Sequence, residues 1–294
     1  MIVRTRFAPS PTGRLHLGHV LAATVARDVA RQHPDGKFLL RHEDIDRQRV
    51  REDFKRKIET DLKWLGLDWD EIPLHQSTRG EAYDMALESL REKGIIYPCF
   101  CTRREIQMEL NRAASAPHAP DISIYPGTCR NLTESIRRKN LDAGIAQAWR
   151  LDSRMATLMA GPLTFTDLRW GTVHVDASTH GDVILSRKDI GPAYHLAVVV
   201  DDAFQKISHV TRGEDLLSAT HVHRILQANL CFPEPVYLHH SLVVDAQGVR
   251  LAKHSHAEAI EELRDRGESP SQVLDRITDF TKLYSLMPNN HFGH

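Results

Sequence analysis

Two histidines on either side of a glycine are the residues in this chain best suited to phosphate chemistry. His16 and His19 flank Gly18 where a turn rich in Pro, Ser and Gly gives way to a helical pattern. A helix N-terminus offers free backbone N–H groups and the positive end of the helix dipole, and glycine lets a ligand approach closely. Imidazole N–H groups there would stabilise charge on a phosphate in its transition state, as when a carboxylate attacks the α-phosphate of ATP. In a chain with 18 histidines, the short pattern alone also arises by chance.

Charged residues also stand where two predicted strands end. Glu43, Asp44 and Asp46 follow the strand predicted at 37–41, and Arg212 precedes a glycine at the end of a later apolar segment. Open α/β sheets bind ligands beyond the carboxyl ends of their parallel strands. A carboxylate there could hold the ammonium group of an amino acid, and an arginine could pair bidentately with a substrate carboxylate. The alternative for the acidic stretch is a solvated turn.

Three of the four cysteines lie in one region of the sequence. Cys99 and Cys101 form a Cys-x-Cys pair, and Cys129 follows them. Such a cluster in a reducing compartment indicates a tetrahedral zinc site, which needs a fourth ligand, and His118 is chemically suited to that place. The alternative is that the three thiols are buried as small hydrophobic groups. Cys231 lies apart from the others and is expected only to pack.

Strand and helix patterns alternate through the first hundred residues. This rhythm predicts a parallel sheet with right-handed crossover connections. Gly66 and Gly94 stand just after two of the helical patterns, as expected for helix C-caps. The expected strands cover 2–8 and 37–41, and the expected helices cover 17–33, 51–65 and 80–93.

The alternation breaks near residue 97, and an insertion is expected from there to about residue 190. It contains the three cysteines, an Ala- and Pro-rich loop and β-rich sequence at 147–186. After it, the apolar run 194–202 is expected to form a buried strand, followed by a helix at 215–230 and a strand at 236–244. We therefore predict an α/β fold whose catalytic domain is split by a subdomain. The predicted parts are a first catalytic half at 1–97, the insertion at 98–190, a second catalytic half at 191–245 and a C-terminal segment at 246–294.

Composition and termini exclude several classes of protein. The 294 residues suffice for one or two domains, and no apolar run approaches the roughly 20 residues that cross a bilayer. The N-terminus has the pattern of a strand rather than of a signal peptide, and the cysteine spacing is not that of secreted disulfide frameworks. The net charge of −1 gives no overall basic field, although a local basic face would suffice for RNA. A cytoplasmic enzyme without a membrane partner is expected.

Taken together, these segments resemble the class I aminoacyl-tRNA synthetases of the glutamyl type. The stretch from Arg6 to His19 is similar to their HIGH signature, and residues 41–46 match their R-x-E-D-x-D pattern. The order of the groups along the chain also agrees. The resemblance implies the Rossmann-like nucleotide-binding fold of that class, split by a zinc-bearing insertion.

A late basic loop extends this resemblance. Residues 248–257 are similar to the KMSKS loop, in which Lys253 matches the second lysine. Arg250 and Ala252 depart from the pattern, at the places of its first lysine and its serine. The resemblance therefore places Lys253 on the ATP phosphates, while the departures leave the other contacts of the loop open.

The resemblance also implies roles for single residues. The residues implied to contact ATP are His16, Gly18, His19 and Lys253, and the catalytic ones among them are His16, His19 and Lys253. The residues implied to bind glutamate are Arg6, Ser10, Glu43, Tyr194 and Arg212, with Glu43 on the ammonium group. Two cations, Arg6 and Arg212, facing a substrate with two carboxylates favour glutamate over glutamine. The alternative for Tyr194 is a core aromatic with a satisfied hydroxyl.

The same resemblance implies one structural zinc ion, with ATP as a substrate accompanied by magnesium. The zinc ligands would be Cys99, Cys101, Tyr125 and Cys129, because glutamyl-type enzymes with this motif use a tyrosine four residues before the last cysteine. Phenolate is an uncommon ligand, so His118 stays open as the rival for the fourth position.

The resemblance implies ATP-dependent activation of L-glutamate to glutamyl-adenylate, followed by transfer to tRNA. A full glutamyl-tRNA synthetase continues into an anticodon-binding region, whereas 37 residues, 258–294, follow the KMSKS-like loop here. We therefore expect a short paralogue, monomeric, that places glutamate on queuosine at the wobble position of tRNA(Asp). The alternatives are a minimal enzyme charging tRNA(Glu), a small-molecule nucleotidyltransferase and a non-catalytic, zinc-stabilised RNA-binding relic.

Overall fold

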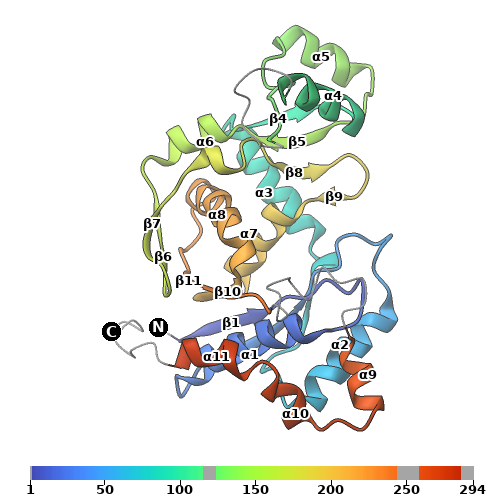
Figure 1. The fold of residues 1–294 in the computed structure, drawn as a ribbon. Helices are drawn as coiled ribbons and strands as arrows, with labels where there is room; N and C mark the ends of the chain where they lie inside the picture. Colours follow the sequence, from blue (N-terminus) through green and yellow to red (C-terminus); the bar gives the residue numbers. More distant parts are fainter. Residues whose placement is uncertain (1, 115–123, 244–257, 286–294) are drawn as a thin grey trace.

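The computed structural model describes residues 2–114, 124–243 and 258–285, and its N-terminal part is a small parallel sheet with helices (Figure 1). The strands, in spatial order, are β1 (Arg4–Phe7), β2 (Lys37–His42) and β3 (Leu74–His75). The helices are α1 (Leu17–Arg31), α2 (Glu52–Trp64), the 3-10 helix η1 (Gln76–Thr78) and α3 (Gly80–Glu92). Gly66 and Gly94 have φ of 70° and 67°, the left-handed region that favours glycine after a helix. The expected alternation and both C-caps are confirmed.

A second sheet continues the first. Its strands, in spatial order, are β10 (His209–Gly213), β11 (Val236–His240), β6 (Thr164–Asp167) and β7 (Gly171–His174), of which the first three are parallel. Ser208 joins the two sheets, because its Oγ accepts a hydrogen bond from Arg4 N (2.8 Å) and its N donates to the Arg4 carbonyl (3.0 Å). Farther along, Arg6 Nη1 donates to the Thr211 carbonyl, so strands β1 and β10 run side by side in the same direction. Strands β6 and β7 belong to this sheet although they lie within 98–190.

Residues 194–202, expected to form a strand, are instead part of helix α7 (Tyr194–Phe204), so that expectation is wrong. Seven consecutive residues from Leu196 to Asp202 are buried. A helix that is buried on every side loses its amphipathic period, and a short apolar run then cannot be distinguished from a buried strand. The next elements are the 3-10 helix η3 (Glu214–Leu216) and α8 (Leu217–Asn229), which match the expected helix.

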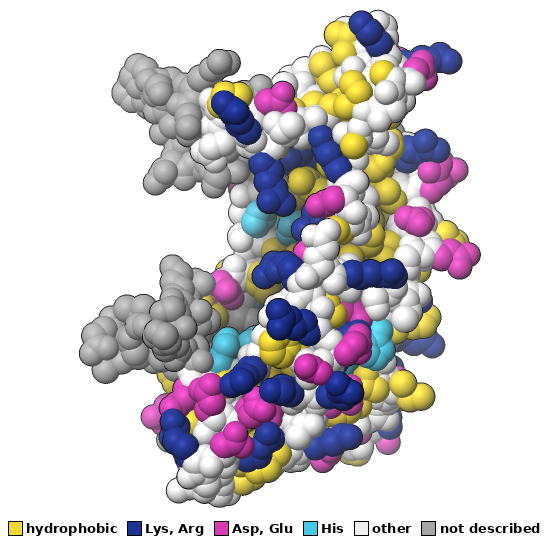
Figure 2. All heavy atoms as spheres, turned by 90° about the vertical axis from the view of Figure 1, so that its right-hand side faces the viewer, with side chains coloured by type: hydrophobic (Ala, Val, Ile, Leu, Met, Phe, Trp, Pro, Cys, Tyr) yellow, Lys and Arg dark blue, Asp and Glu magenta, His cyan; other side chains and the backbone are white. Residues whose placement is uncertain are grey.

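The insertion is built on a third, antiparallel sheet that lies at the upper end of the molecule in Figure 1. Its strands, in spatial order, are β4 (Ile96–Cys99), β5 (Ala148–Leu151), β8 (Ile184–Arg187) and β9 (Gly191–Pro192). Its helices are α4 (Arg103–Ala114), α5 (Glu134–Asp142), α6 (Ser153–Ala160) and the 3-10 helix η2 (Ala177–Thr179). Figure 2 shows Lys and Arg side chains along the whole visible face, intermixed with acidic ones, in keeping with the small net charge.

Three C-terminal helices pack on the first half, with α11 beside α1 and α9 beside α2 (Figure 1): α9 (Ile260–Asp265), α10 (Pro270–Asp275) and α11 (Thr278–Ser285). Leu263 and Val273 are fully buried in the same core as the apolar face of α1. Ile260 N donates to the Leu15 carbonyl at 2.9 Å, which anchors the chain after the KMSKS-like loop beside His16. Among the described residues, no helix is both long and apolar enough to cross a membrane.

Candidate active site and metal site

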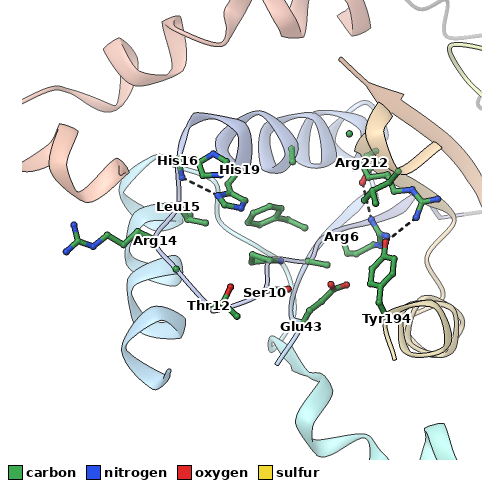
Figure 3. A pocket seen from close by; sticks show the side chains of 18 residues that line it. Arg6, Ser10, Thr12, Arg14, Leu15, His16, His19, Glu43, Tyr194 and Arg212 are labelled. Atoms are coloured by element: carbon green, nitrogen blue, oxygen red, sulfur yellow. Dashed lines mark hydrogen bonds between the residues drawn. The ribbon is translucent and has the colours of Figure 1, made fainter. Parts of the chain in front are cut away.

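A cavity of about 480 Å³ lies where β1, β2 and β10 end and α1 and α7 begin (Figure 3). Seven of the residues named from the sequence line it: Arg6, Ser10, His16, His19, Glu43, Tyr194 and Arg212. Figure 3 shows the two histidines at one end and Arg6, Arg212 and Tyr194 at the other. Gly18 lies in the first turn of α1 between the histidines. Lys253 and His118 lie outside the described residues.

The histidine end of the cavity is held by the start of α1. His16 is the N-cap residue, and its Nδ1 accepts a hydrogen bond from Gly18 N at 3.1 Å. His19 Nδ1 accepts from His16 N at 3.2 Å, and the two rings are 3.8 Å apart. A Cβ on residue 18 would lie 3.0 Å from His16 Cε1, so glycine leaves the room that this ring needs.

These contacts fix the protonation of both rings. Burial lowers the pKa of His16, and burial together with His16 lowers the pKa of His19 to about 3. Both imidazoles are therefore neutral at pH 7, and since each Nδ1 accepts, each proton is on Nε2. The pair presents two neutral N–H donors, which suit phosphate oxygens.

Buried ion pairs hold the other end of the cavity together. Arg6 Nε and Arg41 Nη1 donate to the same oxygen of Asp202, at 2.8 and 2.7 Å, and Arg6 Nη1 also donates to the Thr211 carbonyl. Burial favours the neutral acid, but Arg6 and Arg41 hold the pKa of Asp202 below its usual range. Burial raises the pKa of Glu43, opposed by Arg41, which lies 3.6 Å away. The two cations thus face two carboxyl groups.

Arg212 is held differently, by neutral groups alone. Its Nε donates to His239 Nε2 (3.1 Å), its Nη1 to His223 Nδ1 (3.1 Å) and Tyr194 Oη (3.4 Å), and its Nη2 to Thr220 Oγ1 (2.5 Å). Burial, reinforced by the charge of Arg212, lowers the pKa of His223 well below its usual value, so this histidine is neutral. Within the described part of the chain, no carboxylate lies within ion-pair distance of Arg212. The guanidinium is oriented without being neutralised.

Sequence reasoning missed the residues that hold these arginines, namely Thr220, His223, His239 and Asp202. A signal existed for two of them, because Thr220 and His223 are three residues apart on a predicted helix and so share a face. Asp202 ends the apolar run for which the sequence predicts a strand, and a strand would point its side chain differently from helix α7.

The cysteine cluster lies in the insertion, away from the cavity. The Sγ atoms of Cys99, Cys101 and Cys129 all lie within 4.8 Å of one another. Tyr125 Oη lies 3.5 Å from Cys99 Sγ and 3.4 Å from Cys101 Sγ, and it accepts a hydrogen bond from Cys129 N. Zinc–sulfur bonds of about 2.3 Å place thiolates roughly 3.8 Å apart, so these donors suit a small tetrahedral ion.

The protons of this cluster are shared. A hydrogen bond with Cys129 lowers the pKa of Cys99, while burial raises the pKa of the Tyr125 phenol. Arg150, whose guanidinium carbon lies 3.7 Å from the Tyr125 ring centroid, also lowers the pKa of Cys99. One guanidinium cannot neutralise three thiolates, and a metal ion would supply the missing positive charge. Cys231 is exposed, so the expectation that it packs is wrong.

Comparison with known proteins agrees with this arrangement. The family described as "tRNA synthetases class I (E and Q), catalytic domain" matches residues 2–281. A Rhodobacter capsulatus protein named glutamyl-Q tRNA(Asp) synthetase is 42% identical over 92% of this chain and 97% of its own length. A Syntrophus aciditrophicus protein named glutamate–tRNA ligase 2 is 40% identical over 93% of this chain but 56% of its own length.

Solved structures point the same way. A glutamate tRNA ligase of Elizabethkingia meningosepticum, crystallised in complex with its amino acid, superposes with a TM-score of 0.73 at 28% identity. The match covers 91% of this chain and 54% of that one, so the chain spans about half the length of the glutamate–tRNA ligases that it matches. With its site geometry and these matches, the chain belongs to the class I tRNA synthetases of the glutamyl and glutaminyl type.

Proposed function

We propose that this enzyme activates L-glutamate with ATP and transfers the glutamyl group to queuosine at the wobble position of tRNA(Asp). Relatives from Rhodobacter capsulatus and Nocardia farcinica, both 42% identical, are named glutamyl-Q tRNA(Asp) synthetase. Their matches extend over 97% and 83% of their own lengths. The proposal therefore rests on relatives matched over most of their length.

The observation that best supports glutamate as the substrate is that the Arg212 guanidinium is bound only by neutral groups. Its charge is held by neutral partners, while Arg6 and Arg41 share their charge with Asp202 and Glu43. The site thus has one cation in excess and favours a ligand with one net negative charge. Glutamate has that charge. Arg212 and Arg6 would hold its side-chain carboxylate, and Glu43 and Tyr194 would border its ammonium group.

The chemistry follows from this placement. An α-carboxylate oxygen of glutamate attacks the α-phosphorus of ATP, the bond to the bridging oxygen breaks, and pyrophosphate leaves. The Nε2–H groups of His16 and His19 would stabilise the charge on the phosphates, together with Lys253 and magnesium brought by ATP. A queuosine hydroxyl then attacks the glutamyl carbonyl, and AMP leaves. Alignment of the two substrates supplies roughly 7–11 kcal/mol of such a barrier.

For the insertion we propose one structural zinc ion held by Cys99, Cys101, Cys129 and Tyr125. The ion would stabilise the end of β4 and the loop before α5, and it would take no part in the chemistry. The enzyme is expected to act as a monomer in the cytoplasm, where its tRNA substrate is found.

The decisive experiment is transfer of labelled glutamate, with ATP, to tRNA from queuosine-competent and queuosine-deficient cells. Labelling of tRNA(Asp) from the competent cells alone is the expected result. Labelling of tRNA(Glu) in both pools would instead identify a charging enzyme, the second candidate, which the relatives named glutamate–tRNA ligase support. A lack of labelling in both pools, with no glutamate-dependent ATP–pyrophosphate exchange, would overturn the activity altogether.

A further inference from the structure

The turn between β6 and β7 presents a tryptophan at the same end of the sheet as the catalytic cavity. Trp170 is 51% exposed, whereas Trp64, Trp69 and Trp149 are each largely covered. Because β6 runs parallel to β11 and β10, its carboxyl end lies at the same edge of the sheet as Arg212. A large aromatic surface is thus left uncovered at the edge that binds substrate.

This turn is tied to the glutamate site by hydrogen bonds. The backbone N–H groups of Arg169 and Trp170 donate to Asp167 Oδ1 at 2.9 and 3.1 Å. The other oxygen, Asp167 Oδ2, lies 2.6 Å from His239 Nδ1, and His239 Nε2 accepts from Arg212. One buried carboxylate therefore positions both Arg212 and the exposed tryptophan.

The neighbouring arginine lies over one face of this ring and leaves the other face for a ligand. The guanidinium carbon of Arg169 lies 4.8 Å from the Trp170 ring centroid, and Arg169 Nη1 pairs with Glu214 at 2.8 Å. Glu214 directly follows Gly213, which lines the cavity. The arginine thus links the tryptophan to the rim of the cavity.

We infer that Trp170 is a stacking platform for an unpaired nucleobase of the tRNA substrate, next to the nucleotide whose hydroxyl enters the cavity. This inference rests on the proposed function. Unpaired RNA bases are commonly recognised by stacking on aromatic rings and arginine planes, and each such contact contributes about 1–3 kcal/mol. A nucleobase suits this place because the hydroxyl that receives glutamate must reach the cavity while the flanking nucleotides stay at its rim.

The test separates the two half-reactions. Trp170→Leu keeps an apolar side chain but removes the stacking ring, so the KM for queuosine-bearing tRNA(Asp) should rise roughly 5- to 150-fold in the transfer assay. Trp170→Phe should recover much of that loss. Glutamate-dependent ATP–pyrophosphate exchange without tRNA should stay within about twofold for both variants, because Trp170 is not among the residues that line the cavity. Ile72→Ala, at a residue that is 93% exposed, is the matched surface control.

A direct binding measurement accompanies the kinetics. Titration with queuosine-bearing tRNA(Asp) should quench tryptophan fluorescence in the wild type and much less in Trp170→Phe. An unchanged KM in Trp170→Leu, together with equal quenching in the wild type and in Trp170→Phe, would overturn the stacking platform. The exposed ring would then be a candidate contact for a partner protein instead. Failure of the proposed function is a different result, namely wild-type enzyme that does not label the queuosine-bearing pool. The fluorescence titration is then repeated with the tRNA that is labelled, or with unmodified tRNA(Asp) if none is.

Discussion

The arginine end of the cavity and the cysteine cluster of the insertion have opposite electrostatic requirements. In the cavity, Arg6 and Arg41 are paired with Asp202, and one further cation, Arg212, is held by neutral acceptors. In the insertion, three thiols and a phenol converge beside a single cation, Arg150, which cannot neutralise three thiolates. The cavity has an excess of positive charge, and the cysteine cluster requires additional positive charge.

The difference indicates which ligand each site takes. Burying an uncompensated charge costs several kcal/mol, so an oriented but unpaired guanidinium indicates that an anion completes the site. Converging thiols indicate the reverse, since thiolates become stable together only on a metal ion. Each proposed ligand, the glutamate carboxylate and the zinc ion, has the charge that its site lacks.

Arg212→Ala is expected to have the largest effect, because it removes the unpaired cation of the cavity. Removal of one partner of a buried charge pair costs about 2–5 kcal/mol, so we expect kcat/KM for glutamate to fall roughly 30- to 4,000-fold. Glutamate-dependent ATP–pyrophosphate exchange measures this kcat/KM directly. Arg212→Lys keeps the charge but cannot donate to His239 and Thr220 at once, so it should recover only part of the loss. Wild-type exchange in Arg212→Ala would show that glutamate binds elsewhere.

The paired side of the cavity is tested by Asp202→Asn. The change leaves two buried guanidinium groups without their shared carboxylate and should lower the free energy of unfolding by about 3–5 kcal/mol in urea denaturation. Asp201→Asn is a neighbouring control, because Asp201 is bound by Gln76, Tyr83 and a partly exposed Arg79. We expect a clearly smaller loss there. Equal losses would mean that Arg6 and Arg41 do not depend on Asp202.

The cysteine side is tested by Cys129→Ser and by chelation. Elemental analysis of the purified wild type should find one zinc ion per chain, and the variant should contain much less. Loss of a structural metal should lower Tm by roughly 5 °C or more, while tRNA-independent exchange should change by less than about threefold. Ser208→Ala, far from the cluster, is a control for zinc content. A metal-free wild type with unchanged Tm would favour buried thiols.

Local patterns predicted much of this molecule correctly. The helices at the start of the chain and the C-cap glycines Gly66 and Gly94 follow from periodicity and backbone geometry, which are properties of short segments. The cavity could be assembled because the carboxyl ends of parallel strands meet at one edge, which brings Glu43 and Arg212 together.

The remainder depends on contacts between distant segments. Asp202 meets Arg6 across 196 positions, and Asp167 meets His239 across 72. No short pattern encodes such pairs. The expected strand at 194–202 is also wrong, because helix α7 is buried on every side and has no polar face that would show a helical period in the sequence.

The smallest expected effect concerns the histidine end of the cavity, where both imidazole rings are neutral. The pKa of His19 is lowered to about 3, against about 6.5 in the unfolded chain. Between these values the unfolded state binds the extra proton, so the contribution of His19 is complete above pH 6.5 and is lost progressively toward pH 3. Lowering the pH from 7 to 5 should therefore cost roughly 1–2 kcal/mol of unfolding free energy through this residue. In His19→Gln the decline between these pH values should be shallower by that amount. Parallel curves for the two proteins would mean that the ring has its ordinary pKa in the folded protein and is not held neutral by its burial beside His16.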